Sequence, residues 1–413
     1  MEIAEDLWTG RVSTTARHPF VAPLQELEEL DHGVAFVSSF ANVTALATEA
    51  GLVLIDVGSY ILARQVHARV RAWSQRPLHT AVYTHGHVDH VFGVGLYEQE
   101  PRPERTPAPR VVAHEAVGAR FDRYRLTAGY NRLINARQFG MRDLVWPSDY
   151  RYPDVTYRDR VDLDVGGLRL TLTHARGETD DHTWVWVPER KLLCTGDLFI
   201  WAAPNCGNPQ KVQRYPLDWA RALRAMAELG AELLCPGHGF PIRGVDRIRQ
   251  ALGDTAELLE SLHDQTLALM NAGACLDDVL HTVRAPAHLL DRPYLRPVYD
   301  EPEFIVRNVW RLYGGWYDGN PAHLQPAPAA TVARELATLA GGAARLAERG
   351  AALAAAGDLA LACHLVELAF QAAPDDGDVR RARRAIYARR AELAQSTMAR
   401  GIYGAAADET DAT

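Results

Sequence analysis

The stretch Thr84-His85-Gly86-His87-Val88-Asp89-His90 constrains this chain more than any other. It places three imidazoles and a carboxylate within six residues, directly after the apolar run 79–83, which favours a strand. Zinc accepts imidazole nitrogen and carboxylate oxygen, and a tight loop after a strand can turn such ligands toward two neighbouring cations. The alternative is a His-rich surface loop in which Asp89 caps a following helix. The density of ligand side chains favours a divalent metal site.

The composition describes a folded chain with two domains. A length of 413 residues exceeds one compact domain, and 47% hydrophobic residues are ample for a core. A net charge of -8 without a Lys/Arg-rich run argues against nucleic acid as a partner. The five cysteines are scattered without a Cys-x-x-Cys pair, which indicates neither a disulfide framework nor a thiolate zinc site. With an acidic N-terminus and no apolar run of membrane-span length, these features predict a cytoplasmic protein.

The motif His-x-His-x-Asp-His after a strand resembles the signature of the metallo-β-lactamase superfamily, and the surrounding sequence is most similar to its alkylsulfatase branch. The resemblance extends from about residue 30 to the end of the chain. It implies an α/β fold of the αββα type, with two facing sheets, helices outside and metals at one edge. The pattern of residues agrees, because 33–37, 43–48, 52–56 and 81–83 are typical of strands and 61–73 of an amphipathic helix.

Asp56, at the end of the third of these strands, has two interpretations. In the superfamily a carboxylate at this place supports the metal loop from behind the ligands. As a residue before Gly58 and a predicted helix, Asp56 could equally cap that helix. The sequence leaves both open.

The resemblance also implies ligands far along the chain. Glu178 follows Gly177 at a strand turn where many relatives carry histidine and alkylsulfatases carry glutamate. Its spacing from Asp197 is similar to that between the two acidic ligands of that branch, although alkylsulfatases have glutamate where this chain has Asp197. Asp197 and His238 each follow a run typical of a strand that ends in a turn. The alternatives to Glu178, disfavoured by the spacing, are His174, Asp180, Asp181 and His182.

These residues form a predicted set for a binuclear zinc site. His85, His87 and Glu178 would hold one zinc, and Asp89, His90 and His238 the other, with Asp197 reaching between them. The resemblance implies a hydrolase whose metal-bound hydroxide attacks an ester, because zinc lowers the pKa of water to about 7. Asp89 and Asp197 are the predicted catalytic residues, and Asp89 would orient the water. Iron or manganese could replace zinc.

The predicted substrate pocket departs from the branch it resembles. Within the insert 115–167, residues 122–140 resemble the alkylsulfatase insert near the catalytic cleft, but the position of the arginine that binds sulfate in relatives falls near Asn208. Arginine suits a tetrahedral anion through its paired donors. The predicted substrate residues are Arg137, Asn205, Asn208, Lys211 and Arg214. His114, which follows a strand, is expected to be structural.

Three functions follow from this set. The leading one is hydrolysis of an ester of an organic alcohol, with an alkyl sulfate as the family default. The second is hydrolysis of another labile bond on the same metals, such as a carboxylic ester, thioester, lactone or phosphoester. The third is a metal-binding scaffold without catalysis, against which the seven ligand positions argue.

Beyond residue 245 the pattern becomes helical. Residues 248–270 predict a long amphipathic helix, and 308–321, especially the ending 315–321, resemble a hallmark of the alkylsulfatase dimerisation region. We therefore predict a catalytic domain over 1–245 and an α-helical dimerisation domain over 246–413, with a tail disordered from about 405. Residues 357–375 resemble one tetratricopeptide-like hairpin, which cannot bury its apolar face alone. A second copy of the chain could cover this face, so we predict a homodimer. The predicted partner of the catalytic domain is a small-molecule substrate.

Overall fold

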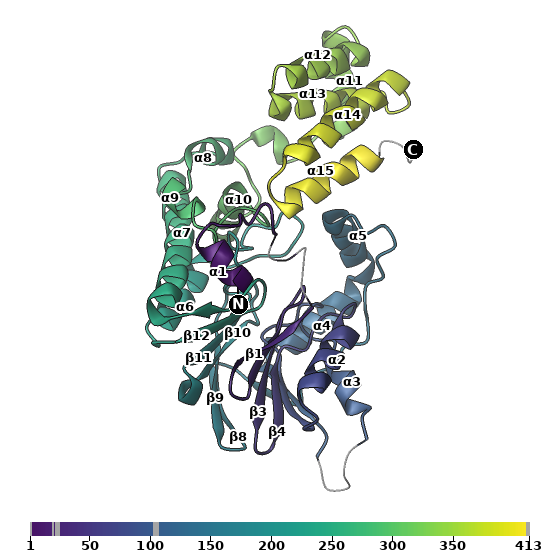
Figure 1. Ribbon diagram of the computed structural model, residues 1–413. Helices are drawn as coiled ribbons and strands as arrows, with labels where there is room; N and C mark the ends of the chain where they lie inside the picture. Colours follow the sequence, from purple (N-terminus) through teal and green to yellow (C-terminus); the bar gives the residue numbers. More distant parts are fainter. Residues whose placement is uncertain (1, 19, 21–24, 102–106, 410–413) are drawn as a thin grey trace. The chain divides into compact units, whose positions relative to one another are not determined.

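The computed structural model describes residues 2–18, 20, 25–101 and 107–409 (Figure 1). Its contacts divide the chain into two compact units. The first consists of residues 1–128 and 146–315, and the second of residues 129–145 and 316–413.

Two sheets form the centre of the first unit. One has the order β1-β2-β3-β4-β5-β6-β7, made by Leu27–Asp31, Val34–Val37, Val43–Thr48, Gly51–Ile55, Leu78–Val82, Arg110–His114 and Val155–Tyr157. The other has the order β13-β12-β11-β10-β9-β8, and from β8 to β13 its strands are Arg160–Val165, Leu168–His174, Thr183–Val187, Leu192–Gly196, Leu233–Pro236 and Ile242–Arg243. The strands and the helix predicted between residues 33 and 83 are confirmed, with ends shifted by up to three residues.

Helices cover the outer face of each sheet (Figure 1). The helices of this unit are α1 Glu2–Trp8, α2 Ala63–Trp73, α3 Val94–Glu98, α4 Ala116–Leu126, α6 Pro216–Ala227, α7 Val245–Asn271, α8 Leu276–Thr282, α9 Ala287–Leu290 and α10 Pro302–Gly314, with a short 3₁₀ turn η1 at Pro188–Arg190. Neighbouring residues of a strand point to opposite faces, so Val53 packs between the sheets and Leu54 packs toward α2. The buried layers confirm the predicted αββα sandwich.

The division into compact units does not fall at residue 245. Helix α7 packs on α6 and α10, and its Leu252, Leu259 and Leu262 are fully buried in the core that covers the second sheet. Since this amphipathic helix completes that core, α7 to α10 belong with the sheets. The assignment of residues 246–413 to a dimerisation domain remains a prediction.

The second unit is helical. It contains α5 Ala128–Phe139, η2 Pro321–His323, α11 Ala329–Leu339, α12 Ala343–Ala355, α13 Leu359–Ala372, α14 Gly377–Leu393 and α15 Thr397–Glu409. Its apolar clusters are small and built largely from alanine and valine. Helix α5, which comes from the insert, packs closely on α15, where a Cβ on Gly401 would lie 2.1 Å from the carbonyl oxygen of Gln138.

The prediction of disorder from about residue 405 is wrong as far as residue 409. Helix α15 continues to Glu409 because Ala407 is buried and Arg383 donates a hydrogen bond to the carbonyl of Ala406. Asp408 also forms an ion pair with Arg142 at 2.8 Å. Residues 410–413 lie outside the described residues. In the part of the chain that the structure covers, no helix combines the length and apolar character needed to cross a bilayer.

Candidate metal centre

The loop that follows β5 is held from behind by Asp56. The Asp56 carboxylate accepts hydrogen bonds from the backbone N–H of Thr84 at 2.8 Å and from its hydroxyl at 2.9 Å. Asp56 has a φ of +57°, a conformation that aspartate and asparagine tolerate better than most residues. Helix α2 begins only at Ala63, and it is the Ser59 hydroxyl that accepts the N–H of Leu62. Asp56 therefore supports the metal loop and does not cap the helix.

Asp56 also fixes the imidazole of His90. Its Oδ2 lies 2.7 Å from His90 Nδ1, so that His90 Nε2 faces Asp89 Oδ2 at 3.6 Å and Asp197 Oδ1 at 3.4 Å. Within the described residues, His90 Nε2 is buried without a hydrogen-bond partner. A histidine held by a carboxylate through one nitrogen presents the other to a cation.

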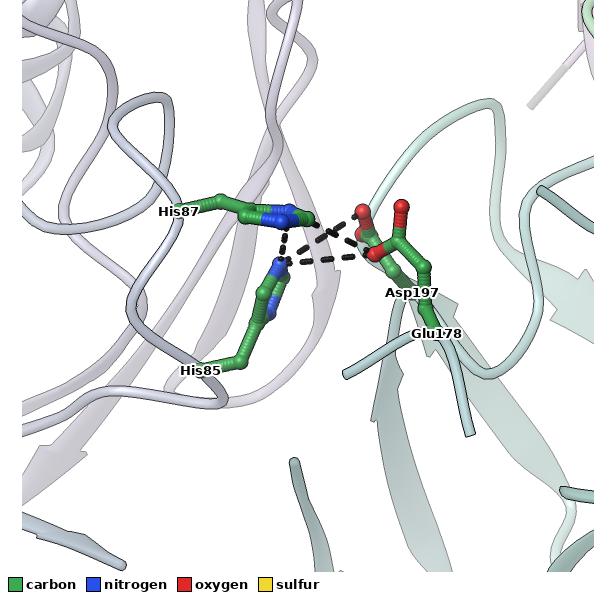
Figure 2. Close-up of side chains that lie close together, drawn as sticks. All are labelled: His85, His87, Glu178 and Asp197. Carbon is green, nitrogen blue, oxygen red and sulfur yellow. Dashed lines mark hydrogen bonds and ion pairs between the residues drawn. The ribbon is translucent and has the colours of Figure 1, made fainter. Parts of the chain in front are cut away.

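The first group of ligand side chains consists of His85, His87, Glu178 and Asp197 (Figure 2). Their ligand atoms all lie within 4.8 Å of one another. Glu178 Oε2 is 3.6 Å from His85 Nε2 and 3.5 Å from His87 Nδ1, and the two imidazole nitrogens are 2.8 Å apart. Side chains from a loop and from the ends of two distant strands thus converge on one point.

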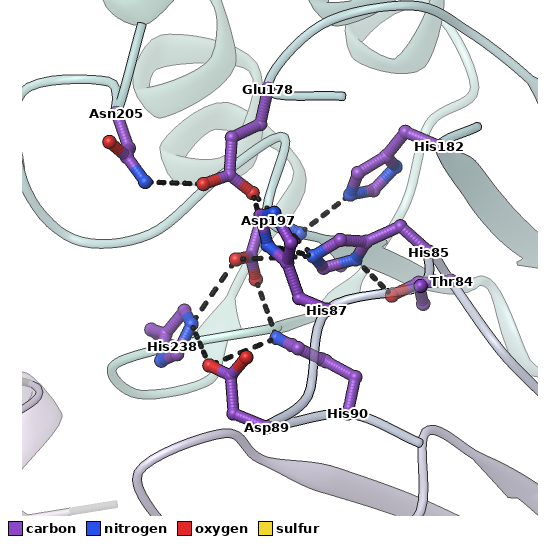
Figure 3. A network of polar contacts seen from close by, with 12 residues as sticks. Thr84, His85, His87, Asp89, His90, Glu178, His182, Asp197, Asn205 and His238 are labelled. Atoms are coloured by element: carbon purple, nitrogen blue, oxygen red, sulfur yellow. Dashed lines mark hydrogen bonds and ion pairs between the residues drawn. The ribbon is translucent and has the colours of Figure 1, made fainter. Parts of the chain in front are cut away.

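The second group consists of Asp89, His90 and His238 (Figure 3). His238 Nε2 lies 3.5 Å from Asp89 Oδ2, while His238 Nδ1 pairs with the carbonyl of Phe40. Asp197 links the groups, because its Oδ2 is 3.2 Å from His238 Nε2 and 3.7 Å from His85 Nε2. The structure therefore brings all seven predicted ligands together in the predicted division.

Gly237 allows the last of these ligands to approach. A Cβ at Gly237 would lie 2.1 Å from Asp197 Oδ1 and 2.7 Å from the carbonyl carbon of Gly196. No side chain fits at such distances, so the turn after β12 can lie against the turn after β11 only with glycine here. This contact places His238 next to Asp197.

The alternatives to Glu178 have other contacts. His182 Nε2 accepts the N–H of Asp197 at 3.0 Å, and its ring stacks on that of His85. Asp181 accepts the N–H of Gly86 at 3.0 Å and pairs with Arg120 at 2.8 Å. These two residues hold the ligand-bearing segments, and neither is a member of either group among the described residues.

The remaining neighbours lie outside both groups. Asp180 pairs with Arg120 and is about half exposed. His114 and His174 stack on each other with ring centroids 3.7 Å apart, and His174 Nδ1 lies 2.9 Å from the carbonyl of His182. A structural part for His114 agrees with this stacking.

The chemistry of the two groups fits bound cations. Glu178 Oε2 and Asp197 Oδ1, like His90 Nε2, are buried and lack a hydrogen-bond partner in the described chain. Burial and the neighbouring histidines hold the pKa of His85 well below its usual value, which keeps this imidazole neutral, the form that binds a metal. Burial raises the pKa of Glu178 to about 7, although Arg214 lowers it. Positive charge at this point would relieve the cost of burying that carboxylate.

The predicted substrate residues fall into different places. Asn205 and Arg214 both pair with Glu178 Oε1, Arg214 through NH1 at 2.6 Å. Asn208 and Lys211 lie in the same loop, which runs from β11 to α6. Burial and the charge of Arg214 lower the pKa of Lys211 to about 7, while Asp89 and Glu178 raise it. Lys211 is therefore close enough to the ligand groups to sense their charge.

Arg137 belongs to the other compact unit. It lies on α5 and is 3.8 Å from Glu409. Its contact with a substrate stays a prediction. Sequence reasoning did not predict the contacts of Arg120 on α4 or of Asn308 on α10. Asn308 opens the stretch 308–321, which resembles the dimerisation hallmark but gives no sign of a contact with Arg214.

Comparisons with known proteins agree with this geometry. Residues 38–238 match the family described as the metallo-beta-lactamase superfamily, and residues 275–412 match the family described as alkyl sulfatase dimerisation. A linear primary-alkylsulfatase from a Pseudomonas strain is 29% identical over 334 residues, which cover 75% of this chain and 61% of the relative. An (R)-specific secondary-alkylsulfatase from Pseudomonas is 26% identical over 333 residues, covering 73% and 50%.

A solved structure shares the fold. The stereoselective inverting sec-alkylsulfatase Pisa1 from Pseudomonas superposes with a TM-score of 0.84 at 23% identity, over 94% of this chain and 66% of that one. The chain thus spans about half to two thirds of the length of the relatives it matches.

Proposed function

We propose that the chain is a metal-dependent hydrolase of a sulfate ester of an organic alcohol, because residues 38–238 match the metallo-beta-lactamase superfamily and residues 275–412 match the family described as alkyl sulfatase dimerisation. The family resemblance seen in the sequence is confirmed by both matches. The observation that carries the proposal is the convergence of seven ligand side chains in two groups that share Asp197.

The cations are proposed to be zinc, with iron or manganese as alternatives. His85, His87 and Glu178 would hold one, and Asp89, His90 and His238 the other, with Asp197 reaching both. Such cations, when bound, supply a water of lowered pKa near 7 and polarise the ester. Each set offers two imidazoles and one carboxylate besides the shared Asp197, and a catalytic zinc site would keep a position for water and substrate.

Asp89 is proposed to orient the attacking water. The side chain of Asp89 is 19% exposed, compared with 5% for Asp197 and 1% for Glu178, so Asp89 is the carboxylate of the cluster that solvent reaches most easily. Its Oδ2 is turned to His90 and His238. A carboxylate in this position can accept a hydrogen bond from water and take its proton.

Lys211 and Asn208 are proposed to receive the sulfate group. The Arg214 guanidinium is paired with Glu178, which leaves the anion to the other polar groups of the same loop. The lowered pKa of Lys211 also favours the second candidate, an ester of lower charge such as a carboxylic ester. A lysine with a pKa of about 7 is only partly charged near neutral pH and attracts an anion less strongly.

A substrate panel tests these candidates. Purified protein is assayed with an alkyl sulfate, p-nitrophenyl acetate and bis(p-nitrophenyl) phosphate, before and after removal of metal, beside an Asp89→Asn variant. We expect sulfate release that depends on metal and falls at least 100-fold in the variant. Cleavage of the acetate alone would favour the second candidate, and full activity without metal would refute the hydrolase proposed here.

A homodimer is proposed from the surface of α11. Val332, Leu336 and Leu339 are 43%, 40% and 84% exposed and form an apolar stripe along one side of this helix. Exposed apolar patches of this kind mark protein interfaces, and α11 lies within the alkyl sulfatase dimerisation match. A second copy around a two-fold axis would cover the stripe. Light scattering should give twice the 45.7 kDa of one chain, and a fully active single chain would contradict the proposal.

A further inference from the structure

The two carboxylate oxygens of Glu178 have different surroundings. Oε2 faces His85 Nε2 and His87 Nδ1 and lacks a hydrogen-bond partner in the part of the chain described. Oε1 instead pairs with Arg214 Nη1 at 2.6 Å and accepts a hydrogen bond from the side-chain amide of Asn205 (Figure 3 shows the Asn205 contact). One oxygen is therefore committed to protein donors, and the other remains for a cation.

Arg214 is built into this site as a buried charge. Its side chain is 4% exposed, and NH1 donates to the carbonyl of Asn205 at 2.7 Å as well as to Glu178. Removing one partner of a buried ion pair leaves an uncompensated buried charge, which is strongly destabilising. The pairing with Arg214 thus fixes both the place and the charge of Glu178.

Helix α10 holds the backbone of Arg214. The side-chain amide of Asn308 donates to the carbonyl of Arg214 at 3.0 Å and accepts the N–H of Arg214 at 3.4 Å. Asn308 Oδ1 also accepts the side-chain amide of Gln213 at 2.9 Å. Asn308 is buried, so these contacts are shielded from competing water.

The start of α10 holds the same loop at a second point. Asp300 Oδ2 accepts the N–H of Gly207 at 2.6 Å, and a Cβ on Gly207 would lie 2.1 Å from the carbonyl carbon of Phe304. The loop between β11 and α6 is therefore fastened to α10 and the residues before it at two points, Gly207 and Arg214.

We propose that α10 is part of the support of the metal centre: Asn308 positions Arg214, and Arg214, with Asn205, positions Glu178 toward the first ligand group. This rests on the proposed function, since it takes the cluster to bind metal. Residues 302–314 lie within the alkyl sulfatase dimerisation match, so a helix of that segment serves the site in addition to any part in assembly. Arg214 and Asn205, which the sequence analysis places among the substrate residues, are assigned here as positioning residues.

Metal titration of the full chain tests this assignment. Metal-free protein is titrated with Co²⁺, followed by its absorption spectrum, and with Zn²⁺ against a competing chelator. We expect Arg214→Gln to weaken one of two equivalents by about 10- to 100-fold and to change the Co²⁺ spectrum of that equivalent, with the other unchanged. Asn308→Ala should weaken the same equivalent less. Arg221→Gln, on the exposed side of α6, is the matched control and should bind as the wild type does.

A double variant decides whether Asn308 acts through Arg214. If it does, Arg214→Gln with Asn308→Ala should bind metal no more weakly than Arg214→Gln alone, because the effects of residues in one chain of contacts are not additive. Additive losses would overturn the inference, as would an Arg214→Gln variant with two wild-type equivalents.

Two further outcomes are distinguishable. A wild-type chain that binds no metal would overturn the proposed function together with this inference, whereas two equivalents of wild-type affinity in every variant would overturn the inference alone. Should Arg214→Gln not fold, Arg214→Lys carries the test: it keeps the charge but not the planar donor, so intermediate weakening supports the assignment and unchanged binding overturns it.

Discussion

Replacing Asp56 by asparagine isolates the support of the metal loop from the ligands themselves. Asp56 accepts three hydrogen bonds, from the Thr84 N–H, the Thr84 hydroxyl and His90. Asparagine tolerates the φ of +57° as well as aspartate does, so the backbone conformation is retained. Asparagine, however, has one acceptor oxygen and an amide that only donates.

Either orientation of the new amide disrupts the loop. If its NH₂ faces the backbone N–H of Thr84, two donors oppose each other at a buried position. In the wild type, a donor and an acceptor lie 2.8 Å apart there. If its NH₂ faces His90, the imidazole must accept at Nδ1 and therefore carries its proton on Nε2, the nitrogen that should bind metal. A lost hydrogen bond to a charged group lowers the free energy of unfolding by about 1.5–3 kcal/mol. Altered support of a ligand weakens metal binding by about 10- to 100-fold.

Two measurements check this prediction. Urea unfolding of the metal-free protein should show a loss of stability of about 2 kcal/mol, and chelator competition should show weaker binding of the equivalent held by Asp89, His90 and His238. Asp154→Asn is the control, because Asp154 also accepts a backbone N–H, that of Val111, but is 40% exposed and outside both ligand groups. An Asp56→Asn protein with the metal affinity of the wild type would refute the argument.

Three further predictions concern the ligand loop and the assembly. His85→Ala with His87→Ala should leave about one metal per chain in place of two and abolish turnover, as metal analysis and the substrate panel would show; two metals retained would contradict the ligand set. Gly86→Ala should lower the free energy of unfolding by about 1–3 kcal/mol, because its Cβ would lie 2.8 Å from the side chain of Arg120, and an unchanged thermal midpoint would contradict this. Glutamate at two positions of the apolar stripe of α11 should give the scattering mass of one chain, and a persistent dimer would place the interface elsewhere.

The features that could be predicted from the sequence are those set by local pattern. The ligand loop, the strands before it and the helix over 248–270 each show in a continuous stretch of residues, and the structure has them in these places. Glu178 and Asp197 were identified through a family spacing, and the structure brings both to the loop. Their assignment as ligands still requires a metal to be measured.

The features that could not be predicted depend on which surfaces meet. The apolar face of α7 shows that it packs against a partner, but only the fold shows that the partner is α6 and the second sheet. The tail after residue 405 is alanine-rich and carries few large apolar side chains, so its helix was missed. Its helix is held by α14 and by an ion pair with the insert residue Arg142, contacts that no local pattern contains.

Arg214 lies close to the ligand groups, as the sequence predicts, but its side chain contacts Glu178, where the sequence analysis predicts a contact with substrate. From the sequence, a cationic residue in a loop near predicted metal ligands suggests a binding site for an anionic substrate. The sequence of the loop does not show which residue neutralises the charge of Glu178. In the fold that balance is local: Glu178 is buried, and NH1 of Arg214 at 2.6 Å is its cationic partner on the side away from the imidazoles. Since a buried carboxylate with one oxygen left for a cation requires such a partner, a nearby arginine is first a candidate for the support of a ligand. We therefore propose that anion binding comes from groups such as Lys211, whose charge the same carboxylates help to maintain.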